Sequence, residues 1–403
     1  MSQLSGEGGF GGFGGFGGFG GFGGFGGFGG FGGFGGFGGF GGFGGSPYDH
    51  PLVSEALVRT RDGLVGTWDK PSVPPSELAI EDADNLARWS AFIRGGVIDF
   101  ELMSRIGFTA EDPDPGSGRP THMKVWHLES SVAAKPGRPP TASYKPLLEI
   151  RRPSMAVFRR QLDFLNEYAE LRTDRGAEIL TQMNGGFAFV ASVSNISPDR
   201  TPFTIELLAA AQRLTIFVHL RLKHALACKR PVEHTPQVQP VIATPGHASF
   251  PSGHASEAFA TAVVLWHLQR AANPNPGDPF IYNSRKWRVQ LLRLAARIAQ
   301  NRTVAGLHFP VDSIVGMLIG VTVGQYLVTR FSQGSAYRAW RFDGSHFNGD
   351  TDFVWHKLYD VDQERLVRTT PKYSSLIGQA NIDPSSADGI LAWLWNKARA
   401  EWA

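Results

Sequence analysis

The chain has 403 residues, a single cysteine and a formal net charge of +3 at neutral pH. One cysteine excludes a disulfide within the chain and argues against a cysteine-based zinc site. The slight positive charge comes without a lysine- or arginine-rich run, so we expect no nucleic-acid partner.

The sequence contains no signal peptide pattern at its start. The first residues, Met-Ser-Gln-Leu-Ser-Gly-Glu, have neither a basic region nor an apolar core. The longest apolar stretch, Ile314–Val328, is interrupted by Thr322 and Gln325 and is shorter than a bilayer span. We therefore expect a cytoplasmic protein with no transmembrane span, in which this stretch forms a buried core helix.

Residues 8–45 repeat Phe-Gly-Gly without a charge or a proline. Glycine loses the most backbone entropy on ordering, and such a run has only isolated phenylalanines to bury. Residues 1–46 are therefore predicted to form a disordered arm. Two interpretations of the arm stay open: a flexible tether whose length drifts by repeat expansion, and a weakly cohesive arm that self-associates through phenylalanine.

Helical spacing of apolar residues begins at Ser76 and again at Pro153, so residues 47–199 are expected to be mostly helical and packed on the core. Between these stretches, Glu111–Pro146 is rich in proline and glycine, which indicates a long excursion over the surface. Residues 332–403 are predicted to form an aromatic-rich C-terminal extension that finishes in an amphipathic stretch.

Residues 200–331 contain four consecutive helical stretches and no convincing strand pattern. The first begins at Thr201-Pro202, where proline is tolerated, and ends before Pro231. The others are predicted over residues 252–270, 284–302 and 310–331. The predicted fold class is therefore mainly α, with a helical bundle over residues 200–331. The long apolar helix faces are compatible with a helix-packed homodimer.

Ser252 is predicted to cap the second helix of this bundle. A Pro-Ser-Gly turn leads directly into that helix, whose unpaired amides and dipole favour an anion. Lys223 and Arg230 lie two turns apart at the end of the first helix, and Arg302 ends the third. These cations and the amides after Ser252 form the donor set that a tetrahedral oxyanion such as phosphate or vanadate needs.

The three pieces of this site follow one another as Lys223–Arg230-Pro231, Pro251-Ser252-Gly253-His254 and Arg302–His308–Asp312. This order of Lys-x6-Arg-Pro, Pro-Ser-Gly-His and Arg-x5-His-x3-Asp resembles the superfamily of type 2 phosphatidic acid phosphatases and vanadium-dependent haloperoxidases. The resemblance covers residues 223–312 and implies a helical bundle of the haloperoxidase and acid phosphatase type. One position departs from the pattern: the family usually has serine where this chain has Asn301, which can still donate a hydrogen bond.

The resemblance also implies a role for each residue. His308 would attack phosphorus in a phosphatase or bind vanadium in a haloperoxidase, and Asp312 would hydrogen bond its other ring nitrogen. His254 would be the general acid or base. The equatorial oxygens of the anion would be bound by the remaining members of the pattern: Lys223, Arg230, Ser252, Gly253 and Arg302.

His247 stands seven residues before His254, a position that resembles that of a histidine in bromide-oxidising haloperoxidases and of a phenylalanine in a chloride-oxidising one. It is a candidate for halide selectivity. The alternative is that His247 only caps or packs the loop that enters Pro251. Four further histidines match no zinc pattern and are assigned no role, namely His219, His224, His234 and His267.

Three functions stay open at this point. The favoured one is a haloperoxidase-like enzyme with vanadate as its cofactor and with hydrogen peroxide and a halide as its substrates. The second is a phosphatase without a cofactor, which hydrolyses phosphomonoesters or lipid phosphates through a phosphohistidine at His308. The third is a non-catalytic oxyanion-binding or assembly protein, and the presence of both His254 and His308 argues against it.

Overall fold

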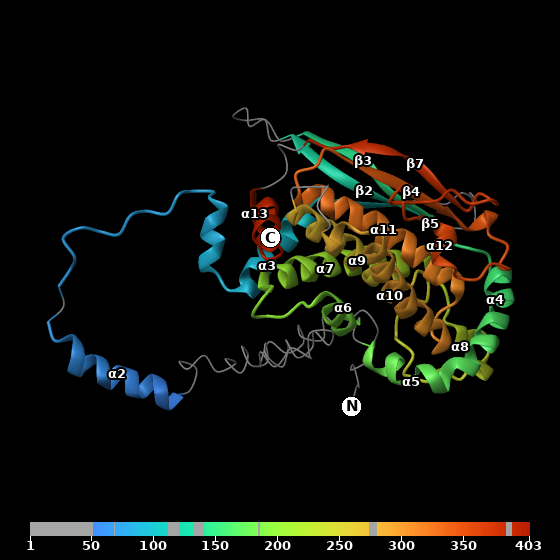
Figure 1. The fold of residues 1–403 in the computed structure, drawn as a ribbon, viewed down its shortest axis with the longest axis horizontal. Coiled ribbons are helices and arrows are strands. Elements are labelled where there is room, and N and C mark those ends of the chain that lie inside the picture. Colours follow the sequence, from blue (N-terminus) through green and yellow to red (C-terminus); the bar gives the residue numbers. More distant parts are fainter. Residues whose placement is uncertain are drawn as a thin grey trace.

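The computed structural model describes residues 51–67, 69–111, 121–131, 141–183, 186–273, 280–383 and 389–403. The predicted arm at residues 1–46 lies outside these residues and stays a prediction. In the described part a layer of helices is covered on one side by a β-sheet (Figure 1). One continuous set of buried apolar side chains joins the two layers.

Four long helices form the centre of the helical layer: α7 (Pro202–Leu226), α9 (Gly253–Ala272), α10 (Arg285–Val304) and α11 (Pro310–Phe331). Their bounds agree with the predicted stretches to within a few residues, and no strand lies between residues 200 and 331 in the part described. Nearly every residue of α9 and α11 is buried, as expected for helices that are apolar on all sides. The predicted mainly α class is confirmed.

Helices α9 and α11 approach each other closely along a row of glycines in α11. A Cβ atom at Gly316 would lie 2.7 Å from the carbonyl oxygen of Ser252, and one at Gly324 would lie 2.9 Å from Cβ of Val263. A larger residue at either position would push the helices apart. The close contact places the N-termini of both helices together, and the Ser252 amide donates to the Asp312 carbonyl at 2.9 Å.

Shorter helices surround this centre: α2 (Pro51–Val65), α3 (Ala91–Met103), α4 (Met155–Tyr168), α5 (Arg172–Thr181), α6 (Phe187–Ser194), α8 (Pro231–His234), α12 (Trp355–Leu358) and α13 (Gly389–Ala400). Helix α2 stands away from the rest in Figure 1. Two largely buried ion pairs attach α3 to α7, Arg94 to Glu206 at 2.5 Å and Arg213 to Asp99 at 2.6 Å. Helices α4, α5 and α8 gather at one end of the bundle (Figure 1).

A five-stranded mixed sheet is the main feature that the sequence did not predict. Its strands lie in the order β1 (Ile106–Glu111), β2 (His122–Ser131), β3 (Thr141–Arg151), β4 (Ala336–Asp343) and β7 (Ser374–Asn381). Only the β3–β4 pair of this sheet is parallel. A small hairpin, β5 (Tyr359–Asp360) and β6 (Arg365–Leu366), lies at the end of α11.

One expectation is therefore corrected: the described parts of Glu111–Pro146 are strands instead of a surface excursion. Residues 47–199 contain β1, β2 and β3 in addition to their helices, and residues 332–403 contribute β4 and β7 to the same sheet. In β2 the buried Met123, Val125 and His127 do alternate with less buried residues, but proline- and glycine-rich flanks hid this short period.

Two helical segments are long and apolar enough to cross a membrane by length and composition, Pro202–His234 and α11. Their most apolar windows are 67 % and 89 % buried inside the protein, respectively. Core helices of folded domains have the same property, so this finding is weak evidence for a membrane span. The expected absence of a span stays a prediction.

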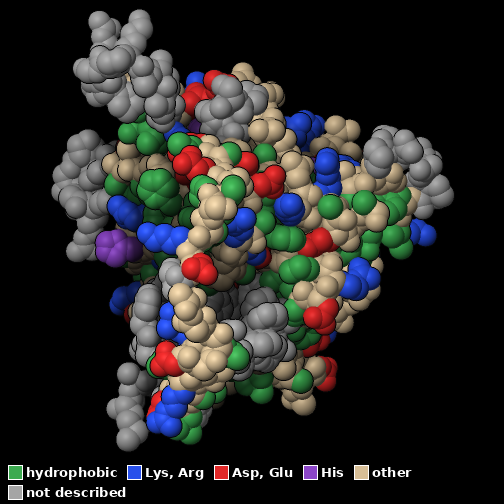
Figure 2. Space-filling view, turned by 90° about the vertical axis from the view of Figure 1, so that its left-hand side faces the viewer, with side chains coloured by type: hydrophobic (Ala, Val, Ile, Leu, Met, Phe, Trp, Pro, Cys, Tyr) green, Lys and Arg blue, Asp and Glu red, His purple; other side chains and the backbone are tan. Residues whose placement is uncertain are grey.

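The molecular surface shown in Figure 2 mixes acidic, basic and hydrophobic side chains across one face. This mixture gives no support there to a nucleic-acid surface, which would gather lysine and arginine.

The large hydrophobic residues exposed on α3 are Phe92, Ile93 and Phe100. The expected homodimer stays a prediction.

Candidate oxyanion-binding site

His308 lies in the turn before α11, and Asp312 lies in the first turn of that helix. His308 Nδ1 is 2.9 Å from Asp312 Oδ2, which also accepts from Ser249 Oγ at 2.5 Å and from the Phe309 amide at 3.1 Å. Arg230 Nη1 lies 3.0 Å from His308 Nε2. Because a guanidinium only donates, Nε2 holds a lone pair and Nδ1 holds the proton. His308 thus presents an unprotonated nitrogen.

The surroundings of His308 favour its neutral form. Burial lowers its pKa well below the ordinary value, and the charges of Arg230 and Lys223 lower it further. Burial raises the pKa of Asp312, whereas the Ser249 hydrogen bond and the charge of Lys223 lower it. A neutral imidazole with its free nitrogen directed at cations is suited to attack phosphorus or to bind a metal.

Lys223 and Arg230 are buried and are held by main-chain carbonyls. Lys223 Nζ, in the last turn of α7, donates to the oxygens of Ala248 at 3.0 Å and Ser249 at 2.8 Å. Arg230 Nη1, just before α8, donates to the oxygen of Leu307 at 3.0 Å. Burial lowers the pKa of Lys223 well below its ordinary value, and that of Arg230 to about 10. An anion nearby would oppose both shifts.

Arg302, in the last turn of α10, has donors that the described residues do not satisfy. Its side chain is fully buried, and Nη2 donates to the Ile179 carbonyl at 3.0 Å. Its Nε and Nη1 have no hydrogen-bond partner among the described residues. Burial lowers the pKa of Arg302 to about 10, so it stays charged at neutral pH. Unsatisfied buried donors of a cation are costly, and these two fit an anion with several oxygens.

His254, in the first turn of α9, is oriented by two main-chain carbonyls. Its Nε2 lies 3.0 Å from the Gln182 oxygen and 3.2 Å from the Met183 oxygen, both just after α5. Carbonyl oxygens only accept, so Nε2 bears a proton and Nδ1 is the atom that can exchange one. Burial, followed by the charge of Arg302, lowers the pKa of His254 to about 3.

His247 is half-buried at the edge of the site. Its Nδ1 lies 3.0 Å from Arg230 Nη2, and its carbonyl accepts from Arg230 Nε at 3.0 Å. His247 therefore contacts a cation of the site. This contact is compatible with both expectations, a role in halide selectivity and a role in packing the loop.

The start of α9 completes the site. Ser252 is the N-cap, and its Oγ accepts from the Ala255 amide at 3.4 Å. Behind it, a Cβ at Gly253 would lie 3.0 Å from His219, whose Nε2 is 3.0 Å from Glu257 Oε1. Burial lowers the pKa of His219 and raises that of Glu257, which favours a neutral pair. His219, predicted to have no role, thus packs directly against the turn at Ser252 and Gly253.

The structure gathers the predicted site residues at one end of the bundle, while their roles stay predictions. Four contributors were missed. Ser249 lies inside the signature, but a serine at that position does not by itself indicate a hydrogen bond to Asp312. Glu257 lies one turn after His254, where a sequence signal was available. Gln182 and Met183 contribute main-chain oxygens, which leave no trace in the residue types.

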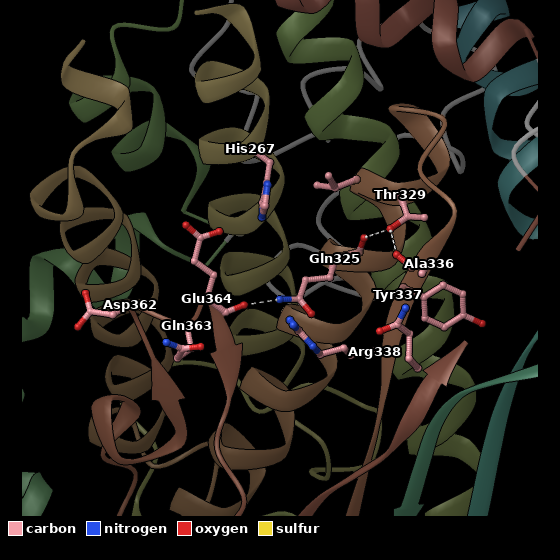
Figure 3. A pocket seen from close by; sticks show the side chains of 11 residues that line it. His267, Gln325, Thr329, Ala336, Tyr337, Arg338, Asp362, Gln363 and Glu364 are labelled. Carbon is pink, nitrogen blue, oxygen red and sulfur yellow. Dashed lines mark hydrogen bonds between the residues drawn. The ribbon is translucent and has the colours of Figure 1, made fainter. Parts of the chain in front are cut away.

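A second cluster lies at the opposite end of α9 and α11 (Figure 3). A cavity of about 480 Å³ opens there between these helices, the β5–β6 hairpin and the sheet. Glu364 accepts from Arg270 at 2.6 Å and from Arg288, while Gln325 donates to its carbonyl at 2.8 Å. Arg270 Nη2 also lies 3.0 Å from Nδ1 of His267. Among the described residues, no group of three or more potential metal ligands could hold a metal ion.

Residues 205–334 match the sequence model of the PAP2 superfamily, which includes phosphatases and haloperoxidases that act on phosphoesters or other oxyanions. The matched segment runs from α7 to just beyond α11 and contains the three signature pieces. This match supports membership in the PAP2 superfamily for the segment that it covers. No curated protein matches the chain.

Proposed function

We propose that this chain is an enzyme that binds a tetrahedral oxyanion beside His308, and that it is a vanadium-dependent haloperoxidase-like enzyme. The observation that best supports an oxyanion is the pair of unpartnered, buried guanidinium nitrogens of Arg302. Lys223 and Arg230 add two cations, while the nearby carboxylate of Asp312 is engaged by His308. These donors fit vanadate and phosphate alike.

In the haloperoxidase, His308 Nε2 would hold vanadium, and Lys223, Arg230 and Arg302 would bind the oxygens. Bound vanadate would supply the activation of hydrogen peroxide, so that peroxide, bromide and one proton give hypobromous acid and water. His247 supports this candidate, because it stands at the position that resembles the halide-selecting one, and its contact with Arg230 is compatible with that role.

His254 would handle the proton. In the free protein it is neutral at pH 7, since its pKa is lowered to about 3. A bound polyvalent anion brings negative charge close to the imidazole and raises its pKa. The added proton goes to Nδ1, because Nε2 already donates to the carbonyls after α5. Anion binding therefore converts His254 from a base into an acid.

A phosphatase is the second candidate, favoured by the unprotonated Nε2 of His308. Arg230 would first transfer its hydrogen bond from Nε2 to an anion oxygen. Nε2 would then attack phosphorus while the ester P–O bond breaks, and His254 would give its proton to the leaving alkoxide. In the second half, water would attack phosphorus, His254 would take the proton of the water, and the N–P bond would break to release phosphate.

The two candidates are separated by one pair of assays on the purified full chain, with and without added orthovanadate. Peroxide-dependent bromination that requires vanadate supports the haloperoxidase. Hydrolysis of a phosphomonoester without vanadate, and its inhibition by vanadate, supports the phosphatase and contradicts the haloperoxidase. If neither activity exceeds that of His308→Ala, the chain is a non-catalytic oxyanion-binding protein.

A further inference from the structure

We propose that the C-terminal end of α5 is a built part of the catalytic site and that Asn301 is the positioning residue that holds it against His254. This inference rests on the proposed function, because it assigns the device that orients the acid–base histidine. Asn301 is the position where the chain departs from the serine usual in the resembled family. The geometry shows what the asparagine does.

Helix α5 meets His254 through its last carbonyls. His254 is nearly fully buried, and its Nε2 reaches the oxygens of Gln182 and Met183. Carbonyls at a helix C-terminus carry partial negative charge, which stabilises an imidazolium next to them. These carbonyls accept a hydrogen bond from His254 in the same way as the carboxylate of Asp312 accepts one from His308. The protonated form of His254 thus depends on where α5 ends.

Asn301 makes three hydrogen bonds that fix this end of α5. Its Nδ2 donates to Gln182 Oε1 at 2.8 Å and to Glu178 Oε2 at 3.0 Å, and its Oδ1 accepts from Arg175 Nη1 at 3.0 Å. Asn301 is fully buried, and so is Gln182. These partners lie along one face of α5 and at its C-terminus. The side-chain amide of Asn301 therefore holds the last turn of α5 in place.

A serine at this position could not make the same set of contacts. A hydroxyl has one donor hydrogen and a shorter reach, so it cannot donate to Glu178 and Gln182 together. Asn301 also precedes Arg302, whose Nη2 donates to the Ile179 carbonyl within α5. Adjacent residues of α10 therefore link the anion-binding guanidinium and the helix end that orients His254.

The charged groups that face His254 come from several elements. Arg302 of α10 opposes its protonation, Glu257 of α9 favours it, and His308, in the turn before α11, interacts with it electrostatically. The two carbonyls of the α5 end also favour protonation. If the two carbonyls move away from Nε2, His254 loses only the part of its proton affinity that they provide. His254 should therefore stay in place but accept its proton less readily.

The test compares Asn301→Ala and Asn301→Ser with Arg297→Gln. Arg297 lies one turn before Asn301 and pairs with the same Glu178 at 2.5 Å, but at a partly exposed site that does not include Gln182. Asn301→Ala should lower kcat about 10- to 100-fold, as expected for a displaced acid–base group. KM should change less than about threefold, because the cations are retained. Arg297→Gln should leave both constants nearly unchanged, and Asn301→Ser should fall between the two.

A second readout does not depend on turnover. Tungstate is a tetrahedral dianion that does not titrate near neutral pH, so calorimetry in buffers of different ionisation enthalpy counts the protons taken up by the protein. The wild type should take up close to one proton per bound tungstate, Asn301→Ala clearly less, and His254→Ala almost none. Tungstate affinity in Asn301→Ala should stay within about threefold of the wild type.

The outcomes are distinct. The positioning role is wrong if Asn301→Ala keeps the kcat and the proton uptake of the wild type. It is also wrong if Arg297→Gln loses as much kcat and proton uptake as Asn301→Ala. If Asn301→Ala loses tungstate affinity and thermal stability together, the residue is merely structural, which also overturns the inference. If the wild type binds no tungstate, the proposed function itself fails, and the inference fails with it.

Discussion

The two ends of the α9–α11 pair both gather arginine and histidine side chains, yet they balance charge differently. At the far end, Arg270 and Arg288 share the carboxylate of Glu364, and one nitrogen of Arg288, Nε, has no partner in the described chain. At the signature end, Lys223, Arg230 and Arg302 are held mainly by main-chain carbonyls, and two nitrogens of Arg302 have no partner in the described chain. The arginines at the far end thus pair directly with a carboxylate, whereas the cations at the signature end have mainly main-chain oxygens as direct partners, an arrangement that favours an anion beside them.

The largest expected effect separates the histidines of the two ends. His308→Ala should lower kcat by about a thousandfold or more, because it removes the atom proposed to attack phosphorus or to bind vanadium. His267 also accepts from an arginine, Arg270, but lies at the end where a carboxylate pairs with the arginines, so His267→Ala should change kcat less than about threefold. Steady-state kinetics of whichever activity the wild type shows measures both. Equal losses of kcat in His308→Ala and His267→Ala would show that the two ends do not differ in function.

The second effect separates the arginines. Arg302→Met should weaken tungstate binding about 100-fold, the scale of losing charged hydrogen bonds in a buried site. Arg288→Met breaks the ion pair with Glu364 and should lower the thermal midpoint, yet leave tungstate affinity within about twofold. Calorimetric titration gives both affinities. Comparable losses in both variants would show that net positive charge, and not the site, attracts the anion.

The third effect uses the glycines along α11. Gly316→Ala would push against Ser252, and Gly324→Ala against Val263 farther along the helix. Each should destabilise the fold by about 1–3 kcal/mol, the usual scale of overpacking. Only Gly316→Ala should also weaken tungstate binding, because Ser252 begins the turn that we propose to bind the anion. Gly96→Ala, where a Cβ meets nothing within 4 Å, is the control and should not destabilise the protein.

The smallest effect concerns Glu178, which anchors α5. The hydrogen bond from Arg297, opposed by partial burial and helped by Asn301, lowers the pKa of Glu178 to about 2. A depressed carboxyl pKa stabilises the fold above its unfolded value of about 4.3, and this stability is lost as pH falls toward about 2. The stability difference between wild type and Arg297→Gln should therefore shrink by a few tenths of a kcal/mol between pH 6 and pH 3. Urea unfolding at several pH values tests this, and a difference that grows toward acid would have the wrong sign.

The helical bundle could be predicted because its signals are local. Pro202 and Pro310 stand in the first turns of α7 and α11, and Ser252 and Ser284 cap α9 and α10. The sheet could not be predicted in the same way. Leu148 of β3 pairs with Trp340 of β4, and nothing within either segment identifies so distant a partner.

The candidate site shows the same division. The side chains that would meet the anion come from three short sequence pieces with fixed spacing, so their gathering could be predicted. The orientation of His254 could not, because main-chain oxygens provide it and any residue type supplies such an oxygen. Asn301 stood out only as a departure from a pattern, and its partners on α5 explain that departure.

The measurement that tests the central claim most directly is anomalous diffraction from tungsten in a crystal of the full chain grown with tungstate. We expect one strong peak within hydrogen-bonding reach of the free guanidinium nitrogens of Arg302 and next to His308 Nε2, and its loss in Arg302→Met. A peak in the cavity beside Glu364, or no peak at the signature end, would contradict the account.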